Sequence, residues 1–357
     1  MPPLPNNTIL LQFRLLRTLG QGGFGITYEA IDTQLQSRVV IKEHLPTSCA
    51  FRWRDHKVYP KRGFERDYRD TLQHAGMEVA ILKGLNHPHI VRVLQDFSVL
   101  NTYYYVMPFI EAAQELGKSA PRPEEITEAW LRPILFALLD ALGYLHGKGL
   151  VHRDVKPTNI LLQNGTKPIL IDFGAAKVAR NPHTAYLIEA QGYTPIEQLQ
   201  IDGQLGPWTD LYALGASCYK LMVGQTPPRS TVRAQNPDSY IPLKNFPNLA
   251  ERFSQAFIDS VEKALNMNPR DRWQSAGEWK QQLVGVPLPH GESVPIPLQE
   301  QEQVPEPGIV PPPPAPPAAK PPNKTRRIVF LCLFMYVLGF ISAIIAMHDL
   351  GLLNINL

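Results

Sequence analysis

The stretch VHRDVKPTNILL, residues 151–162, constrains the fold more than any other part of the sequence. Its centre carries His, Arg, Asp, Lys and Asn, whereas both of its ends are apolar. Apolar flanks around a charged centre are typical of a loop that two short strands hold in place. Charges gathered in such a loop indicate a functional site, whose chemistry depends on what the rest of the chain supplies.

The composition of the chain disfavours several classes of protein. Of the 357 residues, 44% are hydrophobic, which is ample for a packed core, and the net charge is +3. The basic residues are scattered, so no nucleic-acid partner is expected, because nucleic-acid-binding proteins gather basic side chains on one face. Cys49, Cys218 and Cys332 form no CxxC pair, which argues against a zinc site or disulfide framework and fits a reducing compartment. The first ten residues lack the features of a secretory signal.

Residues 11–284 are expected to form one globular unit. Short β-branched and aromatic runs predict strands in its first part. These runs are 10–20, 26–32, 38–43, 90–97 and 102–109. From Ile126 onward helices dominate, with leucines at helical spacing from Leu131 to Leu145 and a stop supplied by Gly147 and Gly149. A strand-rich front and a helical rear predict an α+β fold of two lobes with a cleft between them.

Proline dominates residues 285–323, which include PPPPAPP at 311–317. Such a segment cannot build a core and prefers an extended polyproline conformation, so we expect a stiff linker. A docking site for proline-binding modules is the alternative interpretation.

Residues 328–347 are twenty residues without a charge. A helix of this length is about 30 Å long, which matches the core of a bilayer and predicts a transmembrane helix. The alternative, a buried helix of a soluble domain, is disfavoured by the uniform hydrophobicity of the run.

Three basic residues precede this run: Lys324, Arg326 and Arg327. The only charged residue that follows it closely is Asp349. By the positive-inside rule, residues 1–327 are expected in the cytoplasm and residues 348–357 form a short tail on the other side. The chain would then be a single-pass protein of the inner (plasma) membrane, in contact with the lipid bilayer through 328–347.

Two further patterns point to phosphate binding. GQGGFG places Gly20, Gly22 and Gly25 between the first two predicted strands. Glycines let a backbone approach phosphate closely, and the strand that follows favours a β-hairpin cover over phosphates, with a plain glycine turn as the alternative. Lys42 lies in an apolar strand, so its head either reaches solvent or points into the cleft at phosphate oxygens. In the second case Glu78, in a helical stretch, is a candidate partner.

The loop 151–162 supplies the remaining chemistry. Asp154 lies five residues before Asn159, and Asp172 follows in the sequence ILIDFG. Phosphoryl transfer needs such a set, in which one carboxylate orients the attacking hydroxyl and accepts its proton. The other oxygen groups can hold Mg²⁺, and Lys156 can neutralise charge on the transferred group.

Together these motifs resemble the protein kinases. HRDVKPTN, DFG, the glycine loop and VVIK occur in the order that this family requires. The chain is most similar to the eukaryotic-like (Hanks-type) Ser/Thr kinases of bacteria, and the combination of GGFGITY with VIKEHLP is similar to one bacterial subgroup. The resemblance covers about residues 11–284. It implies a bilobal protein-kinase fold with a small β-rich lobe and a larger helical lobe.

The resemblance also implies ATP and Mg²⁺ as cofactors and assigns roles to the residues above. The implied catalytic residues are Asp154 as the base, Lys156 at the γ-phosphate, and Lys42, which binds the α- and β-phosphates and pairs with Glu78. The implied metal ligands are Asn159 and Asp172. The implied nucleotide contacts are Gly20, Gly22, Gly25, Lys42, the gatekeeper Met107, and Phe109 and Ile110 of the adenine hinge. Met107 can also be a plain core methionine, and both interpretations can hold at once.

Some positions differ from the family pattern. Pro195-Ile196-Glu197 replaces the usual Ala-Pro-Glu, and Arg272 is placed to pair with the retained Glu197. Asp210 matches the aspartate at a helix start that braces the catalytic loop. Ala190 stands where Ser/Thr kinases usually have a threonine bonded to the catalytic Asp and Lys, which removes one tie for positioning a substrate.

Two segments suggest regulation. Arg153 precedes Asp154, an arrangement that resembles kinases switched on by phosphorylation of the loop 172–197. The acceptors in that loop are Thr184 in its polar middle, Tyr186, and Thr194, which is expected to be the least accessible. Residues 51–68 interleave basic and aromatic residues and are interpreted as a solvated loop or an extended front to the helix of Glu78. Contact with anionic lipid or a regulator is the alternative.

We therefore expect a membrane-anchored Ser/Thr protein kinase that transfers the γ-phosphoryl group of ATP to protein hydroxyls with Mg²⁺. Its partners would be protein substrates and, for autophosphorylation, a second copy of itself. One alternative is a pseudokinase scaffold that binds ATP without efficient transfer, which only Ala190 favours. The other is a kinase of a small molecule, against which the retained Glu197 and Arg272 speak.

Overall fold

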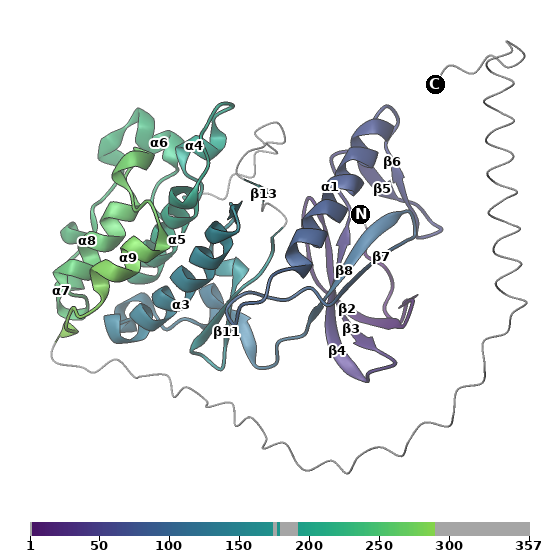
Figure 1. The fold of residues 1–357 in the computed structure, drawn as a ribbon, viewed down its shortest axis with the longest axis horizontal. Coiled ribbons are helices and arrows are strands. Elements are labelled where there is room, and N and C mark those ends of the chain that lie inside the picture. The colour runs from purple at the N-terminus through teal and green to yellow at the C-terminus, as the bar shows by residue number, and fades with distance from the viewer. Residues whose placement is uncertain (1, 174–176, 179–191, 290–357) are drawn as a thin grey trace, which may run out of the picture. The chain divides into compact units, whose positions relative to one another are not determined.

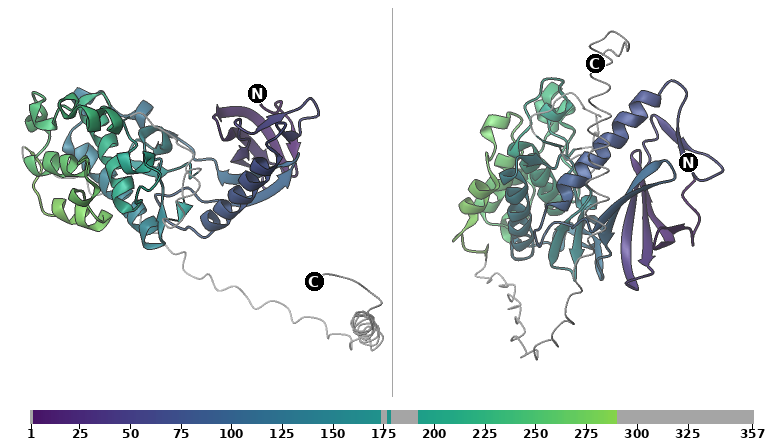
Figure 2. Two further views of the ribbon diagram at one scale, coloured as in Figure 1. Left: turned by 90° about the horizontal axis from the view of Figure 1, so that it is seen from above. Right: turned by 45° about the vertical axis from the view of Figure 1, so that its right-hand side comes forward.

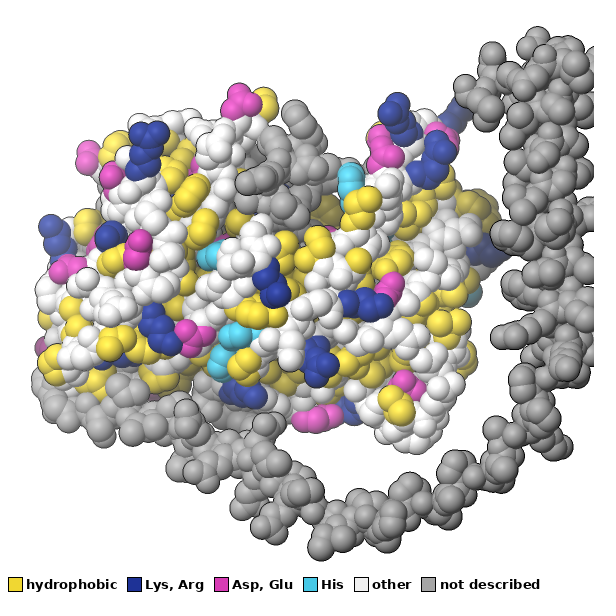
Figure 3. Space-filling view, in the orientation of Figure 1, with side chains coloured by type: hydrophobic (Ala, Val, Ile, Leu, Met, Phe, Trp, Pro, Cys, Tyr) yellow, Lys and Arg dark blue, Asp and Glu magenta, His cyan; other side chains and the backbone are white. Residues whose placement is uncertain are grey.

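The structure is a computed structural model that describes residues 2–173, 177–178 and 192–289. Figure 1 shows a strand-rich lobe, followed along the chain by a helical lobe. The expected α+β arrangement of two lobes is thereby confirmed. On the face drawn in Figure 3, charged side chains of both signs are interspersed over the described part of the chain.

The first lobe is a six-stranded antiparallel sheet in the order β1-β2-β3-β4-β8-β7. Its strands are β1 (Ile9–Leu10), β2 (Phe13–Gln21), β3 (Gly25–Asp32), β4 (Ser37–His44), β7 (Gln95–Val99) and β8 (Thr102–Pro108). The helix α1 (Glu65–Lys83) lies beside β8 (Figure 2). Because side chains alternate along a strand, Ile41 and Glu43 of β4 are buried on one face, and Lys42 projects from the other.

A small hairpin is inserted between β4 and α1. It consists of β5 (Ala50–Arg52) and β6 (Val58–Pro60), so the first half of the segment 51–68 is a hairpin and its second half leads into α1. The aromatic ring of Phe51 contacts those of Trp53 and Tyr59 on it. The segment thus contains an exposed turn at 53–57 between two paired strands, and its end forms the front of the Glu78 helix, as expected.

The hairpin is fastened to the sheet by a buried ion pair. The Arg52 guanidinium donates to the Glu43 carboxylate, and both side chains are almost fully buried. The hydroxyls of Tyr28 and Tyr104 donate to the same carboxylate, at 2.9 and 2.5 Å. Buried charge needs this degree of pairing, because burial removes the water that would otherwise solvate it.

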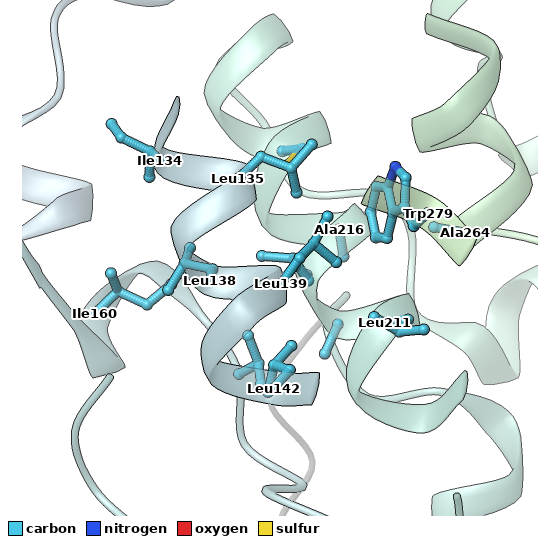
Figure 4. Close-up of a cluster of buried hydrophobic side chains, with 14 of the residues drawn as sticks. Ile134, Leu135, Leu138, Leu139, Leu142, Ile160, Leu211, Ala216, Ala264 and Trp279 are labelled. Carbon is cyan, nitrogen blue, oxygen red and sulfur yellow. The ribbon is translucent and has the colours of Figure 1, made fainter. Parts of the chain in front are cut away.

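The second lobe is a helical core. Its longer helices are α3 (Glu128–Gly147), α5 (Pro207–Val223), α8 (Gln255–Ala264) and α9 (Ala276–Leu283). Its short helices are α2 (Leu116–Ser119), α4 (Ile196–Leu199), α6 (Ser230–Gln235) and α7 (Leu249–Arg252). Figure 4 shows the leucines of α3 packed against Leu211 and Ala216 of α5 and against Trp279 of α9. The helix expected from the leucine spacing is confirmed, including its end at Gly147.

The helical lobe also contains short strands, which form two small sheets. β9 (Ala113–Glu115), β11 (Ile160–Gln163) and β12 (Lys167–Leu170) form one small sheet, and β10 (Leu150–Val151) pairs with β13 (Lys177–Val178). The stretch 151–162 thus begins in one strand and ends in another. The loop between two strands that its pattern predicts is confirmed.

The strand predicted over 90–97 is largely wrong. Only its last residues belong to β7, because Ile90 and Val91 are buried in the core of the helical lobe. The N–H of Val91 donates to the carbonyl of Leu170 at 3.0 Å. This run of β-branched apolar residues is a buried connection between the lobes. The spacing of its apolar residues is the same as that of a buried strand, so the sequence alone cannot distinguish the two.

The folded unit also reaches beyond the expected 11–284. Leu4 and Leu10 are buried in the first lobe and Leu288 in the part after α9. Within the ranges the structure describes, no helix combines the length and apolar character needed to cross a bilayer. The predicted span 328–347, the tail 348–357 and linker residues 290–323 lie outside the described residues.

Replacing Arg52 with Ala should destabilise the first lobe. The Glu43 carboxylate would stay buried with only two phenol donors, and removing one partner of a buried ion pair costs about 3–5 kcal/mol. We expect a clearly lower midpoint of thermal or urea unfolding than for Arg54→Ala, which removes an exposed arginine of the same hairpin. Equal midpoints for the two variants would contradict the proposed fastening.

Candidate active site

Asp154 lies in the loop between β10 and β11. The Lys156 ammonium donates to both carboxylate oxygens of Asp154, at 2.9 and 2.8 Å. The Asn159 amide nitrogen donates to Oδ2 of Asp154 at 2.7 Å and to its main-chain carbonyl at 2.9 Å. The structure thus brings the three predicted side chains into contact. Since both amide protons of Asn159 are used, its Oδ1 is left as an acceptor.

Asp210, at the start of α5, holds this loop in place. Its carboxylate accepts the main-chain N–H groups of His152 and Arg153, each at 2.8 Å, and lies 2.8 Å from Nε2 of His146. Arg153 adopts the left-handed φ of +68°, which is uncommon outside glycine and needs such support. The expected bracing by Asp210 is confirmed.

The charge of Asp210 depends on these donors. Its side chain is fully buried, and burial alone would raise the pKa of the carboxyl. The hydrogen bond and charge of His146, the charge of His152 and the N–H of Arg153 outweigh this and lower the pKa. Asp210 is therefore ionised at neutral pH, and its contribution to stability is lost as the pH falls through the lowered pKa.

Asp172 lies just beyond β12, next to the end of the catalytic loop. Ile160 of β11 pairs with Leu170 of β12, and the N–H of Ile171 donates to the carbonyl of Asn159 at 2.9 Å. Two adjacent antiparallel strands therefore bring the predicted metal ligands Asn159 and Asp172 to one edge. Asp172 has a φ of +61°, a conformation that Asp tolerates better than most residues.

Lys42 projects from β4 towards Asp172 and forms a hydrogen-bonded ion pair with its carboxylate. Burial of the ammonium lowers its pKa, but Tyr105, Asp172 and Glu78 together outweigh burial and raise it well above the ordinary value. Glu78, on α1, thus acts on Lys42 through its charge. The ion pair that the structure forms is with Asp172, and direct pairing of Lys42 with Glu78 stays a prediction.

The predicted glycine loop is the turn between β2 and β3, and the strand expected after it is confirmed. A Cβ at Gly25 would lie 1.9 Å from the carbonyl oxygen of Glu43, so the close approach of β3 to β4 requires glycine there. A Cβ at Gly20 or Gly22 would meet nothing within 4 Å. These two glycines therefore border open space, as a cover over a ligand requires.

The turn is tied to the chain segment that follows β4. The N–H of Leu45 donates to the carbonyl of Phe24, and the N–H of Thr47 to that of Gly23, each at 2.8 Å. The Thr47 hydroxyl donates to the Gly23 carbonyl as well, at 3.2 Å. The position of the turn is thus linked to that of the strand that carries Lys42.

Met107, Phe109 and Ile110 lie at the end of β8, where the chain passes to the helical lobe. Met107 pairs with Val40 and packs against the core of the helical lobe, so it borders the site and fills the core at once. The N–H of Phe109 donates to the carbonyl of Arg38 at 3.3 Å, and the Arg38 guanidinium lies 3.7 Å from the centre of the Phe109 ring. Among the described residues the N–H of Ile110 has no partner, so of the two predicted hinge residues it is the one free to donate to a base.

The donor set fits a nucleotide with Mg²⁺. The Asn159 Oδ1 and the Asp172 carboxylate are hard oxygen ligands at one edge of the site, and Mg²⁺ completes such a shell with phosphate oxygens and water. Among the described residues, no cluster of three or more His, Cys, Asp or Glu side chains could hold a metal ion by itself. The protein residues described thus supply part of a shell, to which a nucleotide would add the rest.

Glu197 and Arg272 form the expected pair. Their side chains are buried, and two parallel hydrogen bonds of 2.7 and 3.1 Å join the guanidinium to the carboxylate. Arg272 also donates to the main-chain carbonyls of Asn266 and Met267. Thr194, just before this pair, is 5% exposed, which confirms that it is poorly accessible.

Sequence reasoning missed several supporting residues. Gln198 of α4 donates to the carbonyl of Arg153 at 2.9 Å, His146 contacts Asp210, and Arg38 stacks on Phe109. None of them belongs to a short motif, because each acts across a long sequence separation. The predicted residues Thr184, Tyr186 and Ala190 lie outside the described residues.

A strand-rich lobe and a helical lobe, with a braced loop of Asp154, Lys156 and Asn159 facing Asp172 and Lys42, define a phosphotransferase of the kinase type. The chain matches the family described as "Protein kinase domain" over residues 13–284. It therefore belongs to the protein kinase family.

Similar proteins include several bacterial kinases. "Serine/threonine-protein kinase PknA" of Nostoc sp. strain PCC 7120 is 28% identical over 284 residues, covering 76% of this chain and 47% of that protein. "Serine/threonine-protein kinase F" of Synechocystis sp. strain PCC 6803 is 30% identical, covering 74% and 53%. The chain thus spans about half the length of these relatives. The resemblance to eukaryotic-like bacterial Ser/Thr kinases is confirmed.

A solved structure agrees with the fold. The structure described as "PpkA-294 apo form" superposes with a TM-score of 0.68 at 34% identity. The match covers 79% of this chain and 99% of that one.

Replacing Arg272 with Ala should destabilise the helical lobe. Glu197 would be left as a buried carboxylate with only Thr209 as a side-chain donor, and the expected cost is about 3–5 kcal/mol. Calorimetry should show a melting temperature several degrees below that of Arg270→Ala, which removes an exposed arginine two residues away. An unchanged melting curve for Arg272→Ala would show that the pair is not needed for stability.

Proposed function

We propose that the protein is a Ser/Thr protein kinase that transfers the γ-phosphoryl group of ATP to a protein hydroxyl. The contact of Lys156 and Asn159 with Asp154, beside the Lys42–Asp172 pair, carries this proposal. The names of the relatives and the match to the protein kinase family support it.

Each residue of the cluster has a distinct task. Asp154 accepts the proton of the substrate hydroxyl and orients that hydroxyl, and its carboxylate keeps 12% of its side-chain surface exposed for this contact. Lys156, already at Asp154, neutralises charge on the transferred group. Lys42 holds phosphate oxygens of the nucleotide beneath the turn of Gly20 and Gly22.

The nucleotide and metal positions follow from the same contacts. Asn159 and Asp172 would hold Mg²⁺, which supplies neutralisation of phosphate charge when bound. The base would lie at Met107, with the free N–H of Ile110 as the hydrogen-bond donor on the chain. Phe109 would contribute through its carbonyl or ring, since its N–H is used by Arg38.

A pseudokinase scaffold is the weaker alternative. A protein that only binds ATP has no chemical use for a base at Asp154 with Lys156 against it. A small-molecule kinase is disfavoured by the buried Glu197–Arg272 pair, which holds the segment around Pro195 in the way expected for a protein substrate.

Replacing Asp154 with Asn should leave ATP binding near normal and abolish most of the transfer. A positioned base contributes on the order of 10²–10⁴ in rate, or about 3–5 kcal/mol. The measurement is the rate of autophosphorylation or of transfer to a generic protein substrate, with ATP affinity measured separately. Asp259→Asn, an exposed carboxylate on α8, is the control and should transfer at the wild-type rate. Near-normal transfer by Asp154→Asn would refute the assignment of the base.

We also propose that the kinase is anchored in the inner membrane. The proposal rests on the charge-free run 328–347 and the basic residues before it, with 285–323 as a linker. The kinase domain would then face the cytoplasm.

Truncation after Pro322 should release the enzyme from the membrane with its activity intact. The full chain should pellet with membranes and resist extraction at alkaline pH, because the predicted helix is buried in lipid. Protease added outside intact cells should leave residues 1–289 uncut. A truncated enzyme that still pellets with membranes would contradict the single anchor and implicate the hairpin segment 51–68.

Control by self-association and autophosphorylation is part of the same proposal. Arg153 has a buried Nε without a hydrogen-bond partner among the described residues, and burial lowers the pKa of its guanidinium. A phosphate on Thr184 would add about −1.5 to −2 charges that could pair with Arg153 and order the loop.

A further inference from the structure

A small pocket lies on the helical lobe between α4 and α6. Its volume is about 450 Å³. The residues that line it are Ile196, Arg233, Ala234, Pro237, Tyr240 and Met267. All but two of these are apolar, so a side chain that enters the pocket meets an apolar wall and one cation, that of Arg233.

Arg233 differs from the other buried arginines of the described part of the chain. Four arginines are buried there: Arg52, Arg132, Arg233 and Arg272. The first pairs with Glu43, the second with Glu128 and the fourth with Glu197. Arg233 is only 7% exposed and forms no ion pair with any described carboxylate. A buried cation without a counter-charge is costly, so this position calls for an anion from elsewhere.

The surroundings of Arg233 orient its guanidinium and leave donors free. The guanidinium lies 4.0 Å from the centre of the Tyr240 ring, and its Nη1 donates to the Tyr212 hydroxyl at 3.1 Å. Its Nε is buried without a partner. Glu262 lies in the same region, where its carboxylate accepts the Tyr240 hydroxyl and the N–H of Leu243, but it forms no ion pair with Arg233. A planar guanidinium held by aromatic rings is well suited to bind a carboxylate or a phosphate through two donors.

The pocket is connected to the active site through α4. Ile196 of this helix lines the pocket, and Gln198 of the same helix donates to the carbonyl of Arg153, one residue before Asp154. An extended peptide advances about 3.3 Å per residue. A peptide whose hydroxyl lies at Asp154 and whose chain follows α4 would bring one of its neighbouring side chains to this pocket.

We propose that the pocket around Arg233 binds an anionic side chain of the protein substrate close to the phosphorylated hydroxyl. The ligand is a carboxylate of Asp or Glu, or a residue that is already phosphorylated. This inference rests on the proposed function, since it names the class of substrate that the same site takes. The enzyme would thus select acidic sequences, with the stem of the acidic residue against Ile196 and Met267 and its charge on Arg233.

The first test uses the full-length enzyme and changes only the peptide. A neutral Ser/Thr peptide is compared with peptides that carry one Glu, moved through about four positions on either side of the acceptor. Matched peptides carry Gln or phosphoserine at the same position. We expect one position at which Glu raises kcat/KM about tenfold or more over Gln, and the phosphoserine peptide shows whether phosphate serves better than carboxylate. The proposal would be overturned if kcat/KM were the same for the Glu and Gln peptides at every position and phosphoserine also had no effect.

The second test ties the preference to Arg233. Arg233→Gln should lose the ratio of the Glu peptide to the Gln peptide, and Arg233→Lys should retain part of it, because the ratio depends on charge and geometry at this position. Arg270→Gln, an exposed arginine, should keep the full ratio. If Arg233 only supports the fold, its variants lower the melting temperature but keep the ratio, and the proposal is wrong.

Direct binding separates this inference from the proposed function. Fluorescence anisotropy of labelled Glu and Gln peptides measures their affinities without any transfer. If the neutral, Gln and Glu peptides are phosphorylated equally well and bind equally tightly, the kinase function stands and the proposed role of the pocket is refuted. Tighter binding of the Glu peptide that depends on Arg233, without transfer to any peptide, would support the pocket and refute the kinase function.

Discussion

The hydrogen bonds to Asp210 are the interaction on which the rest of the site depends. One buried carboxylate at the start of α5 accepts the N–H groups of His152 and Arg153 and so fixes the backbone just before Asp154. The left-handed turn at Arg153 persists because these bonds compensate its cost. Two further hydrogen bonds connect this loop to its neighbours. The carbonyl of Asn159 accepts the N–H of Ile171, next to Asp172, and the carbonyl of Arg153 accepts the side chain of Gln198 on α4.

Each lobe contains a buried ion pair that fastens one segment of the chain to another. Glu43–Arg52 fastens an inserted hairpin to the sheet, and Glu197–Arg272 fastens the segment after the active site to the end of the helical lobe. Such pairs add little net stability compared with apolar side chains, but breaking one is costly. Their effect is to exclude other arrangements, and the second pair fixes the segment from which Gln198 donates to the carbonyl of Arg153.

Much of the site was predictable because its residues lie at fixed short spacings within one loop or strand. Asp154, Lys156 and Asn159 share a loop, and Gly25 is recognisable from its turn. The ion pair of Lys42 with Asp172, the use of the Phe109 N–H by Arg38, and the hydrogen bond of Gln198 depend on contacts between remote segments, which no local pattern encodes. The strand predicted over 90–97 was largely wrong because a buried connection between the lobes and a buried strand contain the same types of residue. Arg233 could not be noticed in the sequence, because the missing partner of a charge is visible only in three dimensions.

The glycine turn has a mechanical consequence. Its carbonyls at Gly23 and Phe24 accept main-chain N–H groups from Thr47 and Leu45, directly after the strand of Lys42. A turn that lifted alone would break both bonds, whereas a rotation of the whole sheet breaks neither. With a nucleotide bound beneath the turn as proposed, its exchange would involve a movement of the first lobe together with the turn, and such movements of whole lobes belong to the slower, microsecond-to-millisecond class of protein motions. The residence time of the nucleotide would then depend on the connection between the lobes, at Ile90, Val91 and the end of β8, more than on the turn that would contact the phosphates.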